Sequence, residues 1–304
     1  MLQHGYDYAP ILATSQRINW RVEDIIGGDK KLDFSKPFLP ESLARVEPLK
    51  FLDRDEKLVL NHIRANGYLY IFGMTEEFIL PFLMDHVRAN LFGNDSRTRA
   101  MLQFAGEEAK HIDLFHRFSK EFESGFGTRC EVIGPPEAIG NAVLAHDPLS
   151  VGLLILGIEW MTQRHYTDSI KDDQTLDPQF KSLLRHHWME EAQHAKLDTL
   201  LVETMAARLS AEQIAKAMDG YLALGAFFDG GVKQQVEFDI AAFVAATGRS
   251  LTAREREEMA AQQHQAQRWT YLGSGMSHPN FLASVGALSP EWRKKLEEIA
   301  PSFS

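Results

Sequence analysis

The chain has 304 residues, of which 44% are hydrophobic and 10% aromatic, so it can bury a sizeable core and does not have a disordered composition. Its formal net charge of −10 excludes a global basic surface for nucleic acid. The single cysteine, Cys130, excludes a disulfide framework and is compatible with the cytoplasm, where we expect the protein. The N-terminus lacks a signal-peptide pattern, and the longest apolar stretch, SVGLLILGIEWM, is too short for a membrane span.

Helical periodicity dominates the chain, and strand signals are sparse. Residues 1–66 are expected to form an N-terminal arm that contains the proline-punctuated stretch SKPFLPESL and ends in a helix at about 53–65. Four long helices are then predicted at about 67–91, 97–124, 148–171 and 178–209. The first should kink at Pro81, and Asp177 with Pro178 should begin the fourth.

Short connections join the first long helix to the second, through a turn and N-cap at GNDS (93–96), and the third to the fourth. About twenty-five residues, with a short helix at about 137–145, separate the second from the third. This pattern predicts an all-α four-helix bundle with one long crossover and additional N- and C-terminal helices. We expect a single domain over 1–304, with its core at 67–209.

Residues 210–304 are predicted to form a C-terminal helical extension without a recognisable motif. Three helices should begin there at Ser210, Thr252 and Ser289, and Glu255 completes a capping box after Thr252. The segment GSGMSHPN at 273–280 is predicted to be a loop.

Two of the four long helices contain the motif Glu-Glu-Ala-x-His. Glu108 and His111 are three residues apart in the first copy, as are Glu191 and His194 in the second. Residues at this spacing share one face of a helix, so each pair can bind a metal ion such as iron. A dinuclear carboxylate centre also needs one glutamate from each of the other two helices.

Both other helices offer such a glutamate. Glu159 is the only acidic residue in the apolar centre of the third helix, whereas the first offers Glu76 and Glu77, about 100° apart on the helix. Glu76 is favoured because more apolar residues surround it, but Glu77 stays an alternative. Burying four carboxylates would cost several kcal/mol each without cations, so the pattern predicts two metal ions per chain.

His187 precedes Glu191 by four residues and shares its face, which predicts a third imidazole ligand. Glu107 and Glu190 each precede a candidate ligand and are either solvated charges or acceptors for the ring N–H of a ligating histidine. The other inspected histidines are interpreted as structural: His116, His165 and His186.

The order Glu…Glu-x-x-His…Glu…Glu-x-x-His resembles that of the ferritin-like diiron oxygenases. The run His-x-x-x-Glu-x-x-His narrows the resemblance to the p-aminobenzoate N-oxygenase family, over about residues 35–207 and including KPFLP. One departure is that both motifs here begin Glu-Glu, where related enzymes often have Asp-Glu; this changes the expected hydrogen bonds around the ligands.

The resemblance implies a ferritin-like bundle that uses O₂ and an electron donor to oxidise a small organic substrate, such as an aryl amine. It implies two iron ions per chain, with manganese possible, and we expect a homodimer without nucleic-acid or membrane partners. The implied ligands are Glu76 (or Glu77), Glu108, His111, Glu159, His187, Glu191 and His194.

Three alternatives remain at this point: a ferroxidase or iron-binding ferritin-like protein, a manganese/iron ligand-binding oxidase, and a radical-generating subunit similar to that of ribonucleotide reductase. The chain is much longer than a bare ferritin bundle. Phe115 stands one turn after the first histidine, where the reductase subunits have a tyrosine, so the sequence argues against the third alternative.

Overall fold

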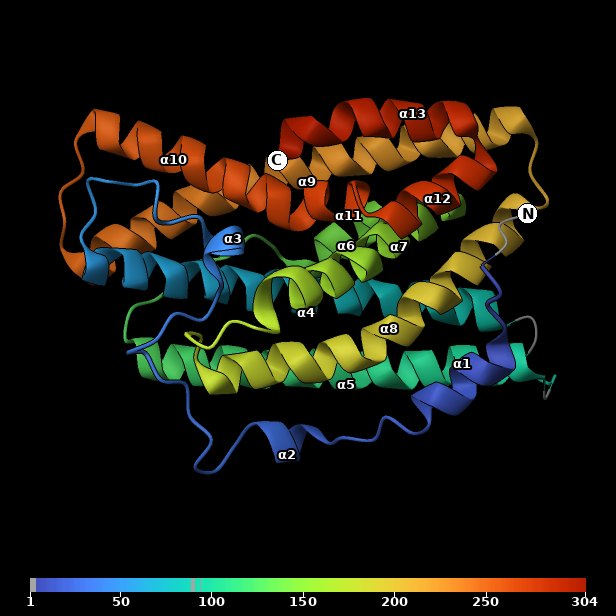
Figure 1. Ribbon diagram of the computed structural model, residues 1–304, viewed down its shortest axis with the longest axis horizontal. Helices are drawn as coiled ribbons and strands as arrows, with labels where there is room; N and C mark the ends of the chain where they lie inside the picture. The colour runs from blue at the N-terminus through green and yellow to red at the C-terminus, as the bar shows by residue number, and fades with distance from the viewer. Residues whose placement is uncertain (1–3, 89–90, 94) are drawn as a thin grey trace.

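The computed structural model describes residues 4–88, 91–93 and 95–304, and no strand occurs within these ranges. Helix α4 (Arg54–Arg88) packs lengthwise against α5 (Ser96–Phe126), and α7 (Pro148–Arg164) packs against α8 (Pro178–Ala206). Helix α6 (Pro136–Leu144) lies in the long crossover from α5 to α7. The prediction of an all-α bundle with one long crossover is therefore confirmed (Figure 1). The bundle consists of α4, α5, α7 and α8.

Two layers cover opposite sides of this bundle (Figure 1). The N-terminal arm lies along α5 and α8 with its helices α1 (Tyr8–Ser15) and α2 (Val22–Ile25), while α3 (Glu41–Ala44) contacts α4. The C-terminal layer packs mainly on α4 and α7. It consists of α9 (Ala211–Thr247), α10 (Ala253–Arg268), α11 (Ser274–Met276), α12 (Pro279–Leu288) and α13 (Pro290–Ile299). None of the helices in the described ranges has the length and apolarity of a bilayer-crossing segment.

Helix starts that depend on local chemistry match the sequence predictions. The Asp177 carboxylate accepts a hydrogen bond from the Phe180 amide, with Pro178 at the first helical position of α8. Capping boxes begin α9 at Ser210 and α10 at Thr252. These ends are encoded within four residues, which is why a sequence pattern finds them.

The predicted division of the first helix is wrong. The segments expected at 53–65 and 67–91 form one helix, α4, that continues through Gly67 and Pro81. Gly67 is buried, with the Gln235 side chain of α9 next to it, and packing by α5 and α9 outweighs the cost of about 1 kcal/mol that glycine adds to a helix. Residues 89–90 of the predicted helix and Asn94 of the predicted turn lie outside the described residues.

The segment 273–280, predicted to be a loop, is mostly helical. A π-helical turn over 269–273 leads into α11, and α12 begins at Pro279. A Cβ atom at Gly275 would clash with the carbonyl oxygen of Gly157, so glycine here allows α11 to approach α7 closely. A second π-helical turn, 165–170, extends α7. Glycines that suggested a loop thus serve helix packing beside the centre of the bundle.

Candidate metal centre

All four bundle helices direct one glutamate into the same part of the core. Glu76 on α4, Glu108 on α5, Glu159 on α7 and Glu191 on α8 are each at most 3% exposed. Glu77 instead lies outside this cluster, where its carboxylate pairs with the His116 ring at 3.1 Å. The structure therefore brings Glu76, and not Glu77, together with the other candidate glutamates.

The three candidate histidines lie among these glutamates and are buried as well. The donor atoms form two overlapping groups in which all atoms are within 4.8 Å of one another. Glu159 is outside both groups, but its carboxyl is adjacent to that of Glu191. The two groups are Glu76, His111, His187 and Glu191, and Glu108, His111, Glu191 and His194.

Two of the carboxylates extend across both groups. Glu191 places Oε1 3.0 Å from His111 Nδ1 and 2.8 Å from His187 Nε2, and Oε2 3.1 Å from His194 Nδ1. Glu108 places Oε1 3.0 Å from His194 Nδ1 and Oε2 3.7 Å from His111 Nδ1. A carboxylate whose two oxygens face different imidazoles can bridge two metal ions.

Many of these close atoms are not hydrogen-bonded to each other. Among the described residues, six buried oxygen and nitrogen atoms of the cluster have no hydrogen-bond partner, although they lie close to one another. Leaving buried polar atoms without partners is costly. Their lone pairs converge on shared space, as they do around a metal ion. The cluster therefore has the ligand set and geometry for two metal ions. The six atoms are Glu76 Oε2, Glu108 Oε1 and Oε2, His111 Nδ1, Glu159 Oε2 and Glu191 Oε1.

Each motif histidine is anchored by a glutamate of the facing helix. His111 Nε2 on α5 donates to Glu190 Oε2 on α8, and His194 Nε2 on α8 donates to Glu107 Oε2 on α5, both at 2.9 Å. These bonds leave Nδ1 of each ring facing the cluster. Of the two interpretations of Glu107 and Glu190, the buried acceptor is the one that the structure supports, and it explains why each motif begins with two glutamates.

The surroundings of the two anchoring glutamates differ in charge. Glu190 forms an ion pair with Lys110, which offsets its charge. Glu107 instead accepts hydrogen bonds from two neutral groups, the Ser15 hydroxyl at 3.2 Å and the Gln103 amide at 3.0 Å. Glu107 is therefore the stronger acceptor, so His194 should be the more electron-rich ligand and the two metal positions should be inequivalent.

His187 has no such anchoring glutamate. Its Nε2 atom lies 3.0 Å from Glu76 Oε1, and its ring meets the edges of Phe72 and Phe115 at centroid distances of 5.9 and 5.0 Å. Burial lowers the pKa of His187, so its imidazole is neutral near neutral pH. This ring is in the protonation state that a metal ligand needs.

Burial and charge divide the four glutamates into two kinds. Burial, followed by the charge of Glu108, raises the pKa of Glu76 well above its usual range, and burial with the charge of Glu191 does the same to the pKa of Glu159. Burial would also raise the pKa of Glu108, but its contacts with Glu76 and His194 lower it to about 2. These surroundings therefore favour the protonated form of Glu76 and Glu159 and the ionised form of Glu108.

The ionised carboxylates raise the pKa of the two motif histidines, His111 and His194. Burial disfavours their charge, but Glu191 and the neighbouring carboxylates outweigh it and raise the pKa of His111 and His194 well above the usual range. Burial likewise opposes the charge of Glu191, whereas His187 and His194 hold its pKa well below the usual range. The neighbouring carboxylates thus favour the protonated form of both imidazoles.

Several residues around the cluster were missed by sequence reasoning. Asp198 is buried four residues after His194. That spacing places both residues on one face of α8 and could have identified Asp198 from the sequence. Lys110 lies next to a ligand candidate, but its sequence position does not reveal which glutamate it meets. Ser15 and Trp20 lie on the N-terminal arm, with the Trp20 ring stacked on His111 at 6.0 Å, and no local pattern places them there.

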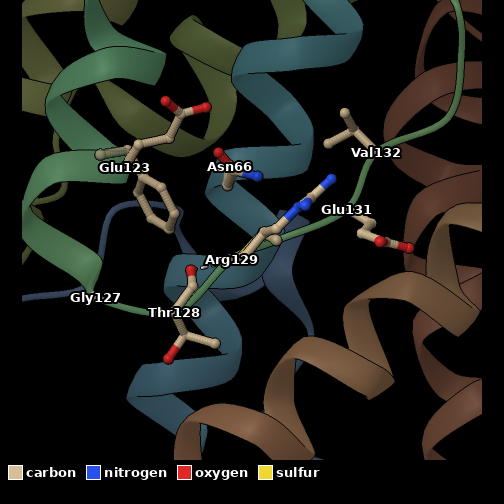
Figure 2. A pocket seen from close by; sticks show the side chains of 9 residues that line it. Asn66, Glu123, Gly127, Thr128, Arg129, Glu131 and Val132 are labelled. Atoms are coloured by element: carbon tan, nitrogen blue, oxygen red, sulfur yellow. Dashed lines mark hydrogen bonds between the residues drawn. The ribbon is translucent and has the colours of Figure 1, made fainter.

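A cavity of about 680 Å³ lies away from the metal centre. Asn66, Glu123 and Arg129 are among the residues that line it, between α4, the end of α5 and the segment that follows (Figure 2). Asn66 precedes Glu76 by ten residues, or about 15 Å along α4. Its polar, charged walls and this separation do not fit a pocket that delivers a substrate to the cluster.

No protein-family model matches the chain, and no curated protein matches it in sequence. Among solved structures, the chain is similar to a point variant of an R2-like ligand-binding oxidase with an aerobically reconstituted Fe/Fe cofactor. The TM-score is 0.47 and the sequence identity 14%, and the match covers 86% of this chain and 92% of that one. Another variant of such an oxidase, with an anaerobically reconstituted Mn/Fe cofactor, gives a TM-score of 0.47 and 14% identity over 87% and 94%.

Metal uptake should release protons. The protons of Glu76, Glu159, His111 and His194 are held by raised pKa values and must leave when these groups bind a cation, so affinity should fall as the pH falls from about 8 to about 6. Titration with a divalent metal in weak buffer with an indicator dye measures the release. Glu159→Gln should release about one proton fewer per chain. An affinity independent of pH, without proton release, contradicts this charge assignment.

The anchoring glutamates should control metal affinity unequally. Glu107→Gln and Glu190→Gln should each weaken binding about 10–100-fold, because a neutral amide orients the imidazole less well. Glu107→Gln should have the larger effect, because Lys110 already offsets the charge of Glu190. Competition with a chromophoric chelator measures the affinities. Glu77→Gln is the matched control outside the cluster, and affinities equal to the parent's in both test variants would refute the role of these glutamates.

Proposed function

We propose that this chain is a non-haem dinuclear iron oxygenase that uses O₂ to oxidise a small organic substrate. One observation carries the proposal: two buried carboxylates, Glu108 and Glu191, each face more than one imidazole, and the cluster leaves several donor atoms without hydrogen bonds. Carboxylate and imidazole ligands in a bundle core suit iron, and a dinuclear centre satisfies all of them together.

The distances support a division of the ligands between two ions. Glu76, His111 and His187 would hold one ion, while His194 and Glu159 would hold the other. Glu108 and Glu191 would contribute oxygens to both ions, because their oxygens face imidazoles of both groups. When bound, the two iron ions supply the electrons and open coordination positions for O₂.

The protein's own contribution is to orient the ligands and exclude water. Glu107 and Glu190 fix the rings of His194 and His111 with Nδ1 toward the cluster. His187 adds an imidazole in a position that water otherwise takes. The two covering layers keep the cluster buried, so charge interactions within it are strong.

We propose an aryl amine as the substrate class, on the basis of the resemblance of the His-x-x-x-Glu-x-x-His run. Conversion of an amine to a hydroxylamine inserts one oxygen atom of O₂ into an N–H bond. The other oxygen atom leaves as water, and this requires two electrons and two protons from outside the substrate. An electron donor is therefore part of the proposal.

One observation favours a second candidate, a manganese/iron oxidase. The anchoring glutamate of His111 is neutralised by Lys110, whereas that of His194 is not. Two inequivalent positions can select two different metals. Metal analysis after reconstitution with both ions present distinguishes this candidate from a diiron centre.

The ligand assignment predicts how single variants lose metal. The parent should bind about two ions per chain, and Glu108→Ala and Glu191→Ala should each lose most of them, because each removes oxygen ligands from both ions. His187→Ala should keep more metal but change the visible spectrum of the oxidised centre. Elemental analysis and circular dichroism measure content and helicity, with Glu77→Ala as the control. Full occupancy in both glutamate variants would overturn the assignment.

The proposed activity predicts substrate-dependent O₂ consumption. Iron-loaded protein supplied with a chemical reductant should consume O₂ faster when an aryl amine is present, and should form the hydroxylamine. An oxygen electrode and mass spectrometry of the product measure both. Metal-free protein and Glu191→Ala are the controls. Rapid oxidation of free Fe²⁺ without any product from the amine would support a ferroxidase instead.

A further inference from the structure

Two apolar cavities lie one after the other in space between the surface and the metal centre. The outer one, of about 430 Å³, opens where α9 has Gly230 and Gly231, which have no side chains to fill the space. The inner one, of about 20 Å³, lies between α4, α7, α9 and the π-helical turn after α10. Phe228 on α9 lines both cavities, so the two cavities meet at this residue.

The inner cavity is one side chain away from the cluster. Phe72 lines it and also meets the His187 ring edge-on at 5.9 Å between centroids. Two other lining residues, Thr75 and Ile158, directly precede Glu76 and Glu159 in the sequence. The cavity is therefore on the side of the centre where these two glutamates enter it.

The size and lining of the inner cavity restrict what it can contain. About 20 Å³ has room for roughly one molecule of the size of water. The Thr75 hydroxyl is already bonded to the Ile71 carbonyl oxygen at 2.8 Å, so the Tyr271 hydroxyl, which has no hydrogen-bond partner among the described residues, is the one side-chain group of the described lining that could bind a water molecule. A water molecule needs two to four polar partners, so such a cavity favours a small apolar molecule.

We propose that the inner cavity holds dioxygen beside the metal centre, and that dioxygen enters it from the outer cavity past the Phe228 ring. The proposal rests on the proposed function in one respect, because it supplies the reason for dioxygen to be there. Dioxygen is apolar and diatomic, so it fits both the volume and the lining. The outer cavity has the volume of a small-molecule site and is the vestibule.

Substitution at Gly230 tests the route with little risk to the fold. A Cβ atom at Gly230 would meet no atom within 4 Å, so Gly230→Leu should fill the vestibule without a clash and should favour the helix. Phe228→Ala should remove the ring where the two cavities meet. Ala241→Leu, at an exposed position of the same helix, is the matched control.

Xenon is the first probe, because it enters small apolar cavities and needs no metal. Crystals of metal-free protein under xenon pressure should show a xenon atom within the inner cavity, and Leu154→Phe, which fills that cavity, should lose it. The second measurement is the rate at which dissolved O₂ oxidises the iron-loaded, reduced protein in stopped flow. Gly230→Leu should slow this rate, and Phe228→Ala should raise it, each by about tenfold, whereas Ala241→Leu should match the parent.

The outcomes separate this proposal from the proposed function. If xenon is absent from the inner cavity, or if Gly230→Leu and Phe228→Ala both react at the parent's rate, the route is wrong even when the oxygenase reaction proceeds. If the reduced, iron-loaded parent does not react with O₂, the proposed function fails, and the assignment of dioxygen to the cavity fails with it. Xenon in the cavity together with opposite rate changes in the two variants supports the route.

Discussion

The fold depends on one constraint: four glutamates are buried at the centre of a helical bundle, where their charge must be neutralised. Burying an uncompensated carboxylate costs several kcal/mol, and the protein has two ways to avoid this cost. One way is to take up protons, and the raised pKa values of Glu76, Glu159, His111 and His194 favour this. The other is to bind two divalent ions, which replace these protons.

The sequence predicted those parts of the structure that depend on local spacing. Helix caps such as Asp177 and the shared face of Glu191 and His194 follow from residues within one turn. The choice between Glu76 and Glu77 was weak, because the rotation of α4 is set by packing against α5 and α9 and not by α4 alone. The continuity of α4 through Gly67 was missed for the same reason.

The surroundings of the cluster were less predictable than the cluster itself. Which glutamate anchors which histidine depends on how α5 and α8 face each other. No sequence pattern therefore indicated that Glu190 on α8 binds His111 on α5 and that Glu107 on α5 binds His194 on α8. The contacts of Ser15 and Trp20 depend on the path of the arm, which no periodic pattern specifies. Short-range spacing identifies metal-binding residues, whereas the groups that tune them come from distant parts of the chain.

The two covering layers give the centre two different sides. On the α5 and α8 side, the N-terminal arm and Lys110 surround the anchoring glutamates with hydrogen-bond donors and charge. On the α4 and α7 side, the C-terminal layer leaves apolar cavities next to Phe72 and Ile158. A polar side suits groups that gain or lose protons when a metal binds, while an apolar side suits uncharged molecules. If the proposed dioxygen route is correct, the apolar side lets an uncharged molecule reach the cluster while the polar groups around Glu107 and Glu190 stay on the opposite side.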